Sequence, residues 1–415
     1  MKICVFTLGC KVNFYESDSL INELKKQGYE CTNKLEFADV YILNTCCVTN
    51  EGERKSRQLV ARCRALNSGA KIIAMGCASQ KNSKQFEELG VSVVVGNGYK
   101  NEIVNLINEE NFVDVKKLPT EYFENMQSDS QRVRAYLKVQ DGCNNFCSYC
   151  IIPFVRGRSR SRAIENVVLE ANRLSETCGE IVLTGINLSD YKPSLIELVE
   201  SLSGVKARLR FGSLEVNVIT DDFLKRLKNV KNFCPHFHLS LQSGSTKVLK
   251  DMNRHYTKEE YLEKVDLIKK YFPFASITTD LIVGFPTETE EDLMESIDTI
   301  KKAKFFMVHC FPYSKREGTK ASLMPQVLNS VKKQREKKVL EVVKEISNEY
   351  LEMLIKNKVC QNVLIEEEVT ILGEKYFVGH SEYFVKCYLK FDDKYKINDI
   401  VACDNFTIFE DGVKC

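Results

Sequence analysis

Three cysteines in one short loop constrain this chain more than any other feature of its sequence. Cys143, Cys147 and Cys150 follow a C-x3-C-x2-C spacing, after a glycine and before an apolar pair. A cubane iron–sulfur cluster has four irons, and a loop with three thiolates ligates only three of them. The fourth iron is then open to a substrate, which is what catalysis at a cluster requires. The spacing therefore favours a catalytic iron–sulfur cluster on this loop.

A structural zinc site is the alternative for this loop. Structural zinc takes four closed ligands and usually shows paired C-x2-C units. No second C-x2-C pair follows, although a distant thiol such as Cys178 could complete four ligands. Thiol spacing and ligand chemistry favour the cluster over zinc.

The bulk composition is that of a globular protein. The 415 residues, 44% apolar and 28% charged, are enough for two or three domains. We expect a cytoplasmic chain without a membrane span, because the sequence shows neither an export signal nor a run of roughly 18 apolar residues. In a reducing compartment, seventeen cysteines indicate metal, cluster or redox chemistry. A net charge of +2 leaves any nucleic-acid contact to local patches.

The first part of the chain predicts an open parallel α/β sheet. Short buried strands alternate with amphipathic helices, as this fold requires. The predicted strands cover 2–8, 39–45, 70–76 and 91–96, and the helices cover 14–28, 52–67, 83–89 and 100–109.

A cysteine follows each of the first three predicted strands. Cys10 lies just past the first, Cys46 and Cys47 just past the second, and Cys77 just past the third. The carboxyl ends of parallel strands line one crevice, where ligands bind, so these thiols should converge. A second three-thiolate cluster is the sharper interpretation, and coincidence among seventeen cysteines is the alternative. Spacing alone does not say whether Cys46 or Cys47 is the ligand.

A second βα series predicts an incomplete (β/α)6 barrel, followed by a small all-β module. The barrel strands are expected at 134–140, 180–184, 208–213, 236–242, 277–283 and 305–311, and the tail strands at 362–368, 375–379, 384–390 and 400–409. A long charged helix over 326–357 separates them. The predicted domains are therefore 1–112, a linker over 113–131, a barrel with its trailing helix over 132–357, and a β module over 358–415.

Glycines and short polar residues end the predicted barrel strands, at the mouth where the cysteine loop also lies. Glycine allows close backbone approach to a ligand, and polar side chains offer directed hydrogen bonds. Ordinary turn chemistry explains any one of them, but their shared position indicates a ligand. The candidate ligand contacts are Thr184, Gly185, Glu215, Gln242 and Gly284.

Over essentially its full length the chain resembles the radical S-adenosylmethionine (SAM) methylthiotransferase family. The motifs that carry this resemblance are Gly9-Cys10, Asn44-Thr45-Cys46, Gly76-Cys77, the loop 142–150, the arginine-rich run 153–162, Gln242-Ser243-Gly244 and the run 283–286. The resemblance favours Cys46 over Cys47, since the family's thiol follows Asn-Thr directly. It also implies that the barrel is a radical SAM barrel and that the tail is an RNA-binding TRAM-like module, although a short one.

The resemblance implies two [4Fe–4S] clusters and SAM as cofactors. One cluster would use Cys143, Cys147 and Cys150, and the other would use Cys10, Cys46 and Cys77. SAM would serve both as the source of a 5′-deoxyadenosyl radical and as methyl donor, with the methylthio group passing to C2 of an adenine. The implied partners are the tRNA anticodon loop and a flavodoxin- or ferredoxin-like electron donor, with no membrane. We expect the chain to be a monomer.

Two segments resemble one branch of that family. Residues 7–13 and 311–319 are similar to the branch that modifies N6-threonylcarbamoyladenosine beside the tRNA anticodon. Enzymes acting on isopentenyladenosine in tRNA, or on an aspartate of a ribosomal protein, are the alternatives within the family. A non-catalytic iron–sulfur or zinc RNA-binding protein is the alternative outside it, and such a site has no use for an open iron.

Local basic residues are the candidates for RNA contact. Arginine forks match phosphate oxygens and position RNA without reading its sequence. A solvated helix face is an equally good interpretation of the group that follows Cys46. The two groups are Arg156, Arg158, Arg160 and Arg162 beyond the cysteine loop, and Arg54, Lys55, Arg57, Arg62 and Arg64 after Cys46.

Overall fold

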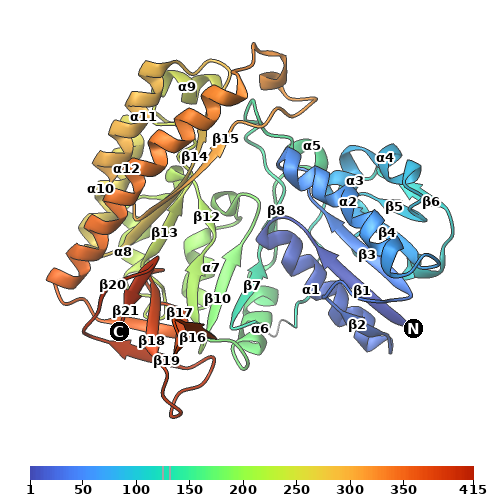
Figure 1. Cartoon of the computed structure of the whole chain (residues 1–415), viewed down its shortest axis with the longest axis horizontal. Helices are drawn as coiled ribbons and strands as arrows, with labels where there is room; N and C mark the ends of the chain where they lie inside the picture. Colours follow the sequence, from blue (N-terminus) through green and yellow to red (C-terminus); the bar gives the residue numbers. More distant parts are fainter. Residues whose placement is uncertain (124–125, 130–131) are drawn as a thin grey trace.

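The N-terminal part of the chain is a six-stranded parallel sheet (Figure 1). The structure is a computed structural model that describes residues 1–123, 126–129 and 132–415. In pairing order the strands are β2 (Glu30–Thr32), β1 (Lys2–Thr7), β3 (Val40–Thr45), β4 (Lys71–Gly76), β5 (Val93–Val95) and β6 (Phe112–Asp114). The helices are α1 (Lys11–Lys26), α2 (Asn50–Leu66), α3 (Cys77–Lys81) and α4 (Ser83–Glu88).

The predicted open parallel sheet is confirmed. Every residue of β3 is buried; Tyr41 and Leu43 enter one hydrophobic core, and Val40 and Ile42 enter another on the opposite face. Burial on both faces is why the parallel strands read as continuous apolar runs. The short strands β2 and β6 were not predicted, and the expected helix over 100–109 is replaced by short 3-10 turns.

The predicted linker over 113–131 is only partly within the described residues, because 124–125 and 130–131 lie outside them. Strand β6 crosses the predicted boundary at 112 and pairs with β5. The domain boundaries stay predictions.

The central part is a barrel of parallel strands that is open on one side. In order around it are β7 (Arg134–Lys138), β10 (Glu180–Thr184), β11 (Arg208–Phe211) with β12 (Ser213–Leu214), β13 (His236–Leu239), β14 (Ser276–Val283) and β15 (Met307–Pro312). Among the described residues the outer strands β7 and β15 do not pair with each other, so the predicted incomplete barrel is confirmed. Helix α1 of the N-terminal part lies beside the edge strand β7 (Figure 1).

Helices follow the barrel strands, and the first of them packs against α3 of the N-terminal part. They are α5 (Ile152–Arg156), α6 (Ile164–Leu174), α7 (Leu195–Ser201), α8 (Asp221–Leu227), α9 (Thr246–Asp251), α10 (Lys258–Tyr271), α11 (Glu290–Ala303) and the long α12 (Asn329–Lys356). A Thr257–Glu260 capping box begins α10, which satisfies backbone N–H groups that its first turn leaves free. A short antiparallel pair, β8 (Gln140–Asp141) and β9 (Arg160–Ser161), closes the base of the cysteine loop.

The C-terminal module is all-β, as predicted. Its strands, in pairing order, are β19 (Ile400–Cys403), β16 (Gln361–Ile371), β17 (Glu374–His380), β18 (Lys386–Lys390), β21 (Gly412–Lys414) and β20 (Thr407–Phe409). Arg208 and Arg210, near the amino end of β11, donate hydrogen bonds to the module's His380 and Ser381 carbonyls at 2.8 and 3.0 Å. The module is thus held at the end of the barrel opposite the cysteine loop.

One cysteine pair departs from the expectation of reduced thiols. Cys403 and Cys415 form a disulfide within the C-terminal module. Cys63 and Cys234 are buried free thiols, and Cys31 is a partly exposed free thiol.

Candidate functional site

Cys10, Cys46 and Cys77 lie at one edge of the N-terminal sheet, after the neighbouring strands β1, β3 and β4. Gly9 and Gly76, directly before two of them, have φ values of +109° and +105°. A Cβ atom on Gly9 would lie 2.9 Å from the Cys46 Cβ and 3.0 Å from its Sγ. Glycine is therefore required for the two cysteine segments to approach this closely.

The three thiols share a charged environment. Burial, and then the neighbouring thiols of Cys77 and Cys10, raise the pKa of Cys46 to about 11. The Arg156 guanidinium acts in the opposite direction, and its Nε donates a hydrogen bond to the Cys77 Sγ at 3.3 Å. A cluster binds thiolates, so a fixed cation beside the set helps the thiols to lose their protons.

Cys47 belongs to the hydrophobic core. It is fully buried together with Leu43, Leu59 and Cys63, and burial raises its pKa. Cys46 is the member of the adjacent pair whose Sγ faces the Gly9–Cys10 segment. This placement agrees with the choice of Cys46 over Cys47.

The loop of Cys143, Cys147 and Cys150 is fixed by hydrogen bonds with the segment after α9. Asn253 donates from Nδ2 to the Asn145 and Phe146 carbonyls at 3.0 and 3.2 Å. The Ser148 N–H donates to the Met252 carbonyl at 2.9 Å. These hydrogen bonds fix the backbone of the loop, and its three cysteines line one cavity.

That cavity has a volume of about 140 Å³ and is lined by all three thiols, together with Glu215 and Gln242. Arg254 contacts two residues of the cavity wall. Its Nη1 donates to the Cys147 Sγ at 3.4 Å, and its Nη2 lies 2.8 Å from the Glu215 Oε1. The residues fit a SAM-binding cluster, because three thiolates leave one iron open and the Glu215 carboxylate can meet an amino group. Arg254 was missed from the sequence, where no motif marks it.

Thr184 and Gly185 line a neighbouring cavity of about 370 Å³, which Cys10 and Lys11 also line. Gly284 does not line either cavity. A Cβ atom there would lie 2.4 Å from the Lys332 Cγ of α12, and its φ is +70°. Gly284 therefore has a helix-packing reason to be glycine.

Ser213 lies where three cavities meet. It lines the cavity of the cysteine loop, the cavity around Cys10, and a third cavity inside the barrel. The structure therefore brings the two thiol sets, which lie more than 60 residues apart in sequence, to two sides of one space. A substrate atom beside Ser213 would face both.

The prediction that Arg156, Arg160 and Arg162 contact RNA is wrong. Arg156 and Arg162 are each 1% exposed. Arg160 Nη2 pairs with Asp141 Oδ2 at 2.8 Å, and Arg162 pairs with the buried Glu170. These guanidiniums neutralise buried carboxylates, which would otherwise be costly to bury. Of the four, Arg158 is exposed.

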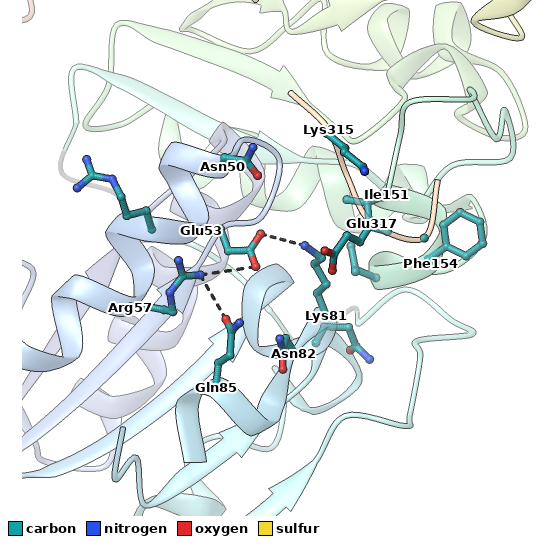
Figure 2. A pocket seen from close by; sticks show the side chains of 14 residues that line it. Asn50, Glu53, Arg57, Lys81, Asn82, Gln85, Ile151, Phe154, Lys315 and Glu317 are labelled. Atoms are coloured by element: carbon teal, nitrogen blue, oxygen red, sulfur yellow. Dashed lines mark hydrogen bonds and ion pairs between the residues drawn. The ribbon is translucent and has the colours of Figure 1, made fainter. Parts of the chain in front are cut away.

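A polar groove of about 870 Å³ lies between the N-terminal part and the barrel (Figure 2). Arg54 and Arg57 of α2 line it, together with Lys81 and Lys315. Figure 2 shows Glu53 near its centre, paired with Lys81 at 3.0 Å and with Arg57 at 3.7 Å. Ile151, directly after Cys150, lies on the same groove, so the groove adjoins the cysteine loop.

The rest of the basic group after Cys46 divides between surface and structure. Arg64 donates to the Ala70 and Gly90 carbonyls and so fixes loops. Lys55 pairs with Glu51 along the helix at 3.5 Å, and Arg62 is exposed. The solvated-face interpretation thus holds for part of this group.

Zinc is a poor match for either thiol set. In the part of the chain that the structure describes, no three His, Cys, Asp or Glu side chains are close enough to hold a single metal ion. An iron–sulfur cube spans more space than one ion, and its thiolate ligands stand correspondingly farther apart. Cys178 is buried just before β10, at the other end of the barrel from the cysteine loop, so it cannot complete a zinc site there.

Two family models match the chain. The radical SAM superfamily covers residues 137–300, and the uncharacterized protein family UPF0004 covers residues 2–96. Among solved structures, a radical S-adenosylmethionine methyltransferase, TsrM from Kitasatospora setae, has the same fold with a TM-score of 0.58 and 15% identity, covering 78% of this chain and 77% of that one. The barrel and its cysteine loop are thus those of a radical SAM enzyme, which uses SAM and a [4Fe–4S] cluster.

Curated relatives narrow this class. The threonylcarbamoyladenosine tRNA methylthiotransferase MtaB of Aquifex aeolicus is 38% identical, covering 91% of this chain and 95% of its own. The tRNA-2-methylthio-N(6)-dimethylallyladenosine synthase of Caldicellulosiruptor saccharolyticus is 34% identical, covering 87% and 81%. The chain belongs to the family of radical SAM tRNA methylthiotransferases. None of the helices that the structure describes has the length and apolar character needed to cross a membrane.

Proposed function

We propose that this enzyme transfers a methylthio group to C2 of N6-threonylcarbamoyladenosine next to the tRNA anticodon. Relatives named for this substrate in Aquifex aeolicus and Bacillus subtilis match nearly the whole chain at 38% and 36% identity. The observation that carries the proposal is the common space at Ser213, which both thiol sets adjoin. One substrate carbon placed there is within reach of hydrogen removal from one side and sulfur delivery from the other.

Each thiol set has its own role in this proposal. Cys143, Cys147 and Cys150 would hold the [4Fe–4S] cluster that binds SAM, and the other set, Cys10, Cys46 and Cys77, would hold a second cluster. When bound, the clusters and SAM supply the 5′-deoxyadenosyl radical and the methylthio group, because acid–base groups do not activate this C–H bond.

The chain's own side chains position SAM. Arg254 fixes the Glu215 carboxylate at the wall of the cysteine-loop cavity, and Asn145 Nδ2 donates to the same carboxylate at 2.7 Å. Glu215 is thereby held ready for a cationic amino group, while Gln242 offers an amide to the same cavity. Thr184 and Gly185 shape the adjoining space around Cys10.

Single-electron chemistry also implies a flavodoxin- or ferredoxin-like electron donor. We assign the enzyme as a monomer.

The groove of Figure 2 is the proposed path of the anticodon loop. Arg54, Arg57, Lys81 and Lys315 line it; Arg54 pairs with Glu51, and Arg57 and Lys81 share Glu53, so RNA phosphates would compete with these carboxylates for the cations. The target nucleoside must leave its stack to reach the barrel mouth, and a single-stranded loop permits this at low cost.

Isopentenyladenosine is the second candidate substrate. Relatives named as dimethylallyladenosine synthases match 87% and 88% of the chain. Their identities of 34% and 36% overlap those of the threonylcarbamoyladenosine enzymes, so a direct test is needed.

Nucleoside mass spectrometry of tRNA from a deletion strain tests the substrate. We expect 2-methylthio-N6-threonylcarbamoyladenosine to disappear and to return with the wild-type chain, but not with Cys147→Ala or Cys46→Ala. Cys31→Ala, which changes a partly exposed thiol away from both sets, is the matched control and should restore the nucleoside. An unchanged level in the deletion strain would refute the assignment, and loss of the isopentenyl product instead would support the second candidate.

A further inference from the structure

The barrel encloses a cavity of about 340 Å³ that the mechanism above does not use. Its wall includes residues from every barrel strand, and it opens at Ser213 toward both thiol sets. Phe384 of the C-terminal module closes its floor and stacks on His236, with ring centroids 4.6 Å apart. The cavity therefore leads away from the proposed reaction point, toward the C-terminal module.

We call this cavity inside the barrel the lumen, and one of its walls is polar. His238 Nε2 lies 3.3 Å from the Asp280 Oδ2, and its Nδ1 lies 2.9 Å from the Thr278 Oγ1. The His309 ring lies 5.8 Å from the His238 ring, and burial lowers its pKa, which favours the neutral imidazole. An apolar ligand would offer these groups no further hydrogen bond, whereas a ligand with donors and acceptors would.

The lumen also contains a lysine that has no close ion-pair partner. Arg134 Nε lies 3.3 Å from Glu366, and Arg210 Nη2 lies 2.8 Å from Glu180, so both arginines have counter-ions. Lys11 has no carboxylate within 4.0 Å in the described part of the chain, and Asp280, which lines the same lumen, is the carboxylate whose charge acts on it. It follows Cys10 and lines both the lumen and the cavity around that thiol. A lysine in this position is a ready partner for an anion that enters through the opening at Ser213.

We propose that the lumen receives the substituent on N6 of the target adenosine, and that Lys11 binds the carboxylate of that substituent. This inference rests on the proposed function. A threonylcarbamoyl group has a carboxylate for Lys11, and its N–H and hydroxyl groups match Asp280, His238 and His309. The volume lies within the range of roughly 300–1,000 Å³ that holds small organic groups.

The same wall discriminates against the alternative substrate. An isopentenyl group has no polar atoms, so it would offer no ion pair to Lys11 and no hydrogen bond to Asp280 or the imidazoles. Sites built to hydrogen-bond a substrate group reject analogues that lack the group far more strongly than apolar pockets reject polar ones. Lys11 is therefore a specificity-determining residue, and it acts on binding rather than on the radical step.

A substrate-charge experiment tests the inference. Two synthetic anticodon stem-loops would be compared, one carrying N6-threonylcarbamoyladenosine and the other its methyl ester, which lacks the negative charge. For the reconstituted full chain we expect the Kd ratio of ester to acid to be roughly 10 to 100, as for a hydrogen bond to a charged group. Lys11→Met should bring this ratio close to one, and Lys11→Arg, which keeps the charge, should preserve most of it.

Because Lys11 neighbours Cys10, a substitution at Lys11 could change binding indirectly, through Cys10. A variant of Asp280, which also lines the lumen, is therefore a second test. Asp280→Asn removes a negative charge from the lumen and should raise the ester-to-acid ratio roughly threefold or more. Ratios near one in the wild type, or ratios unaffected by both Lys11→Met and Asp280→Asn, would overturn the inference. Turnover is scored on the same RNAs: a preserved charge preference without methylthiolation would support the lumen assignment and contradict the proposed function instead.

Discussion

At the scale of single residues, Arg156 joins the two thiol sets. It lies on α5, a few residues after Cys150, yet its guanidinium reaches Cys77 of the N-terminal part. Its Nη1 also lies 3.0 Å from both Glu16 Oε1 and Asp141 Oδ1. Burial alone would raise the pKa of Glu16, but Arg156, Lys100 and Lys138 lower it, so the carboxylate stays charged. This buried network fixes how the N-terminal sheet meets the barrel.

Arg156→Gln should therefore destabilise the chain. Removing one partner from a buried ion pair leaves uncompensated charges, and we expect a loss of about 3 kcal/mol in the free energy of unfolding, measured by urea denaturation. Arg158→Gln is the matched control. Arg158 is exposed over the Phe146 ring at 4.3 Å, a contact worth at most about 1 kcal/mol. Equal effects of the two substitutions would contradict the role given to Arg156.

At the scale of elements, strand ends determine where the chemistry lies. The thiol sets could be predicted because each cysteine of the N-terminal set follows a buried strand, and parallel strands end at a common edge. Glu215 and Gln242 follow the same rule. Gly284 shows its limit: a glycine with positive φ after a strand serves close packing by α12 as readily as ligand approach. Sequence pattern alone does not separate these two uses.

Helix α2 and the segment after β15 form the groove assigned to RNA. Arg57→Glu combined with Lys315→Glu should weaken tRNA binding roughly tenfold, because each phosphate contact adds affinity that falls with salt. The slope of log Kd against log salt should decrease in magnitude by about one to two. Fluorescence anisotropy over a salt series measures both quantities.

Lys337→Glu is the matched control for charge. Its side chain is 82% exposed on α12, and it does not line the groove. A loss of affinity as large for Lys337→Glu as for the groove variant would place the RNA elsewhere.

At the scale of the whole molecule, three cavities meet at Ser213. Their linings come from distant segments of the chain, so no single sequence motif predicts that they meet. The opening between β7 and β15 admits the Cys10–Lys11 end of α1, while the C-terminal module closes the other end with Phe384. Arg254 and Lys11 acquire their neighbours only when distant loops close together. The separate parts were thus predictable, whereas the geometry that joins them depends on tertiary contacts.

The central claim is that one site is built from two thiol sets. The iron content per chain tests this claim most directly. After anaerobic reconstitution the wild-type chain should hold about eight irons, and each triple Cys→Ala variant, at 10/46/77 or at 143/147/150, should hold about four. Only the variant that retains Cys143, Cys147 and Cys150 should still show SAM bound to its cluster by spectroscopy. About four irons in the wild type, unchanged when Cys10, Cys46 and Cys77 are replaced, would contradict the account.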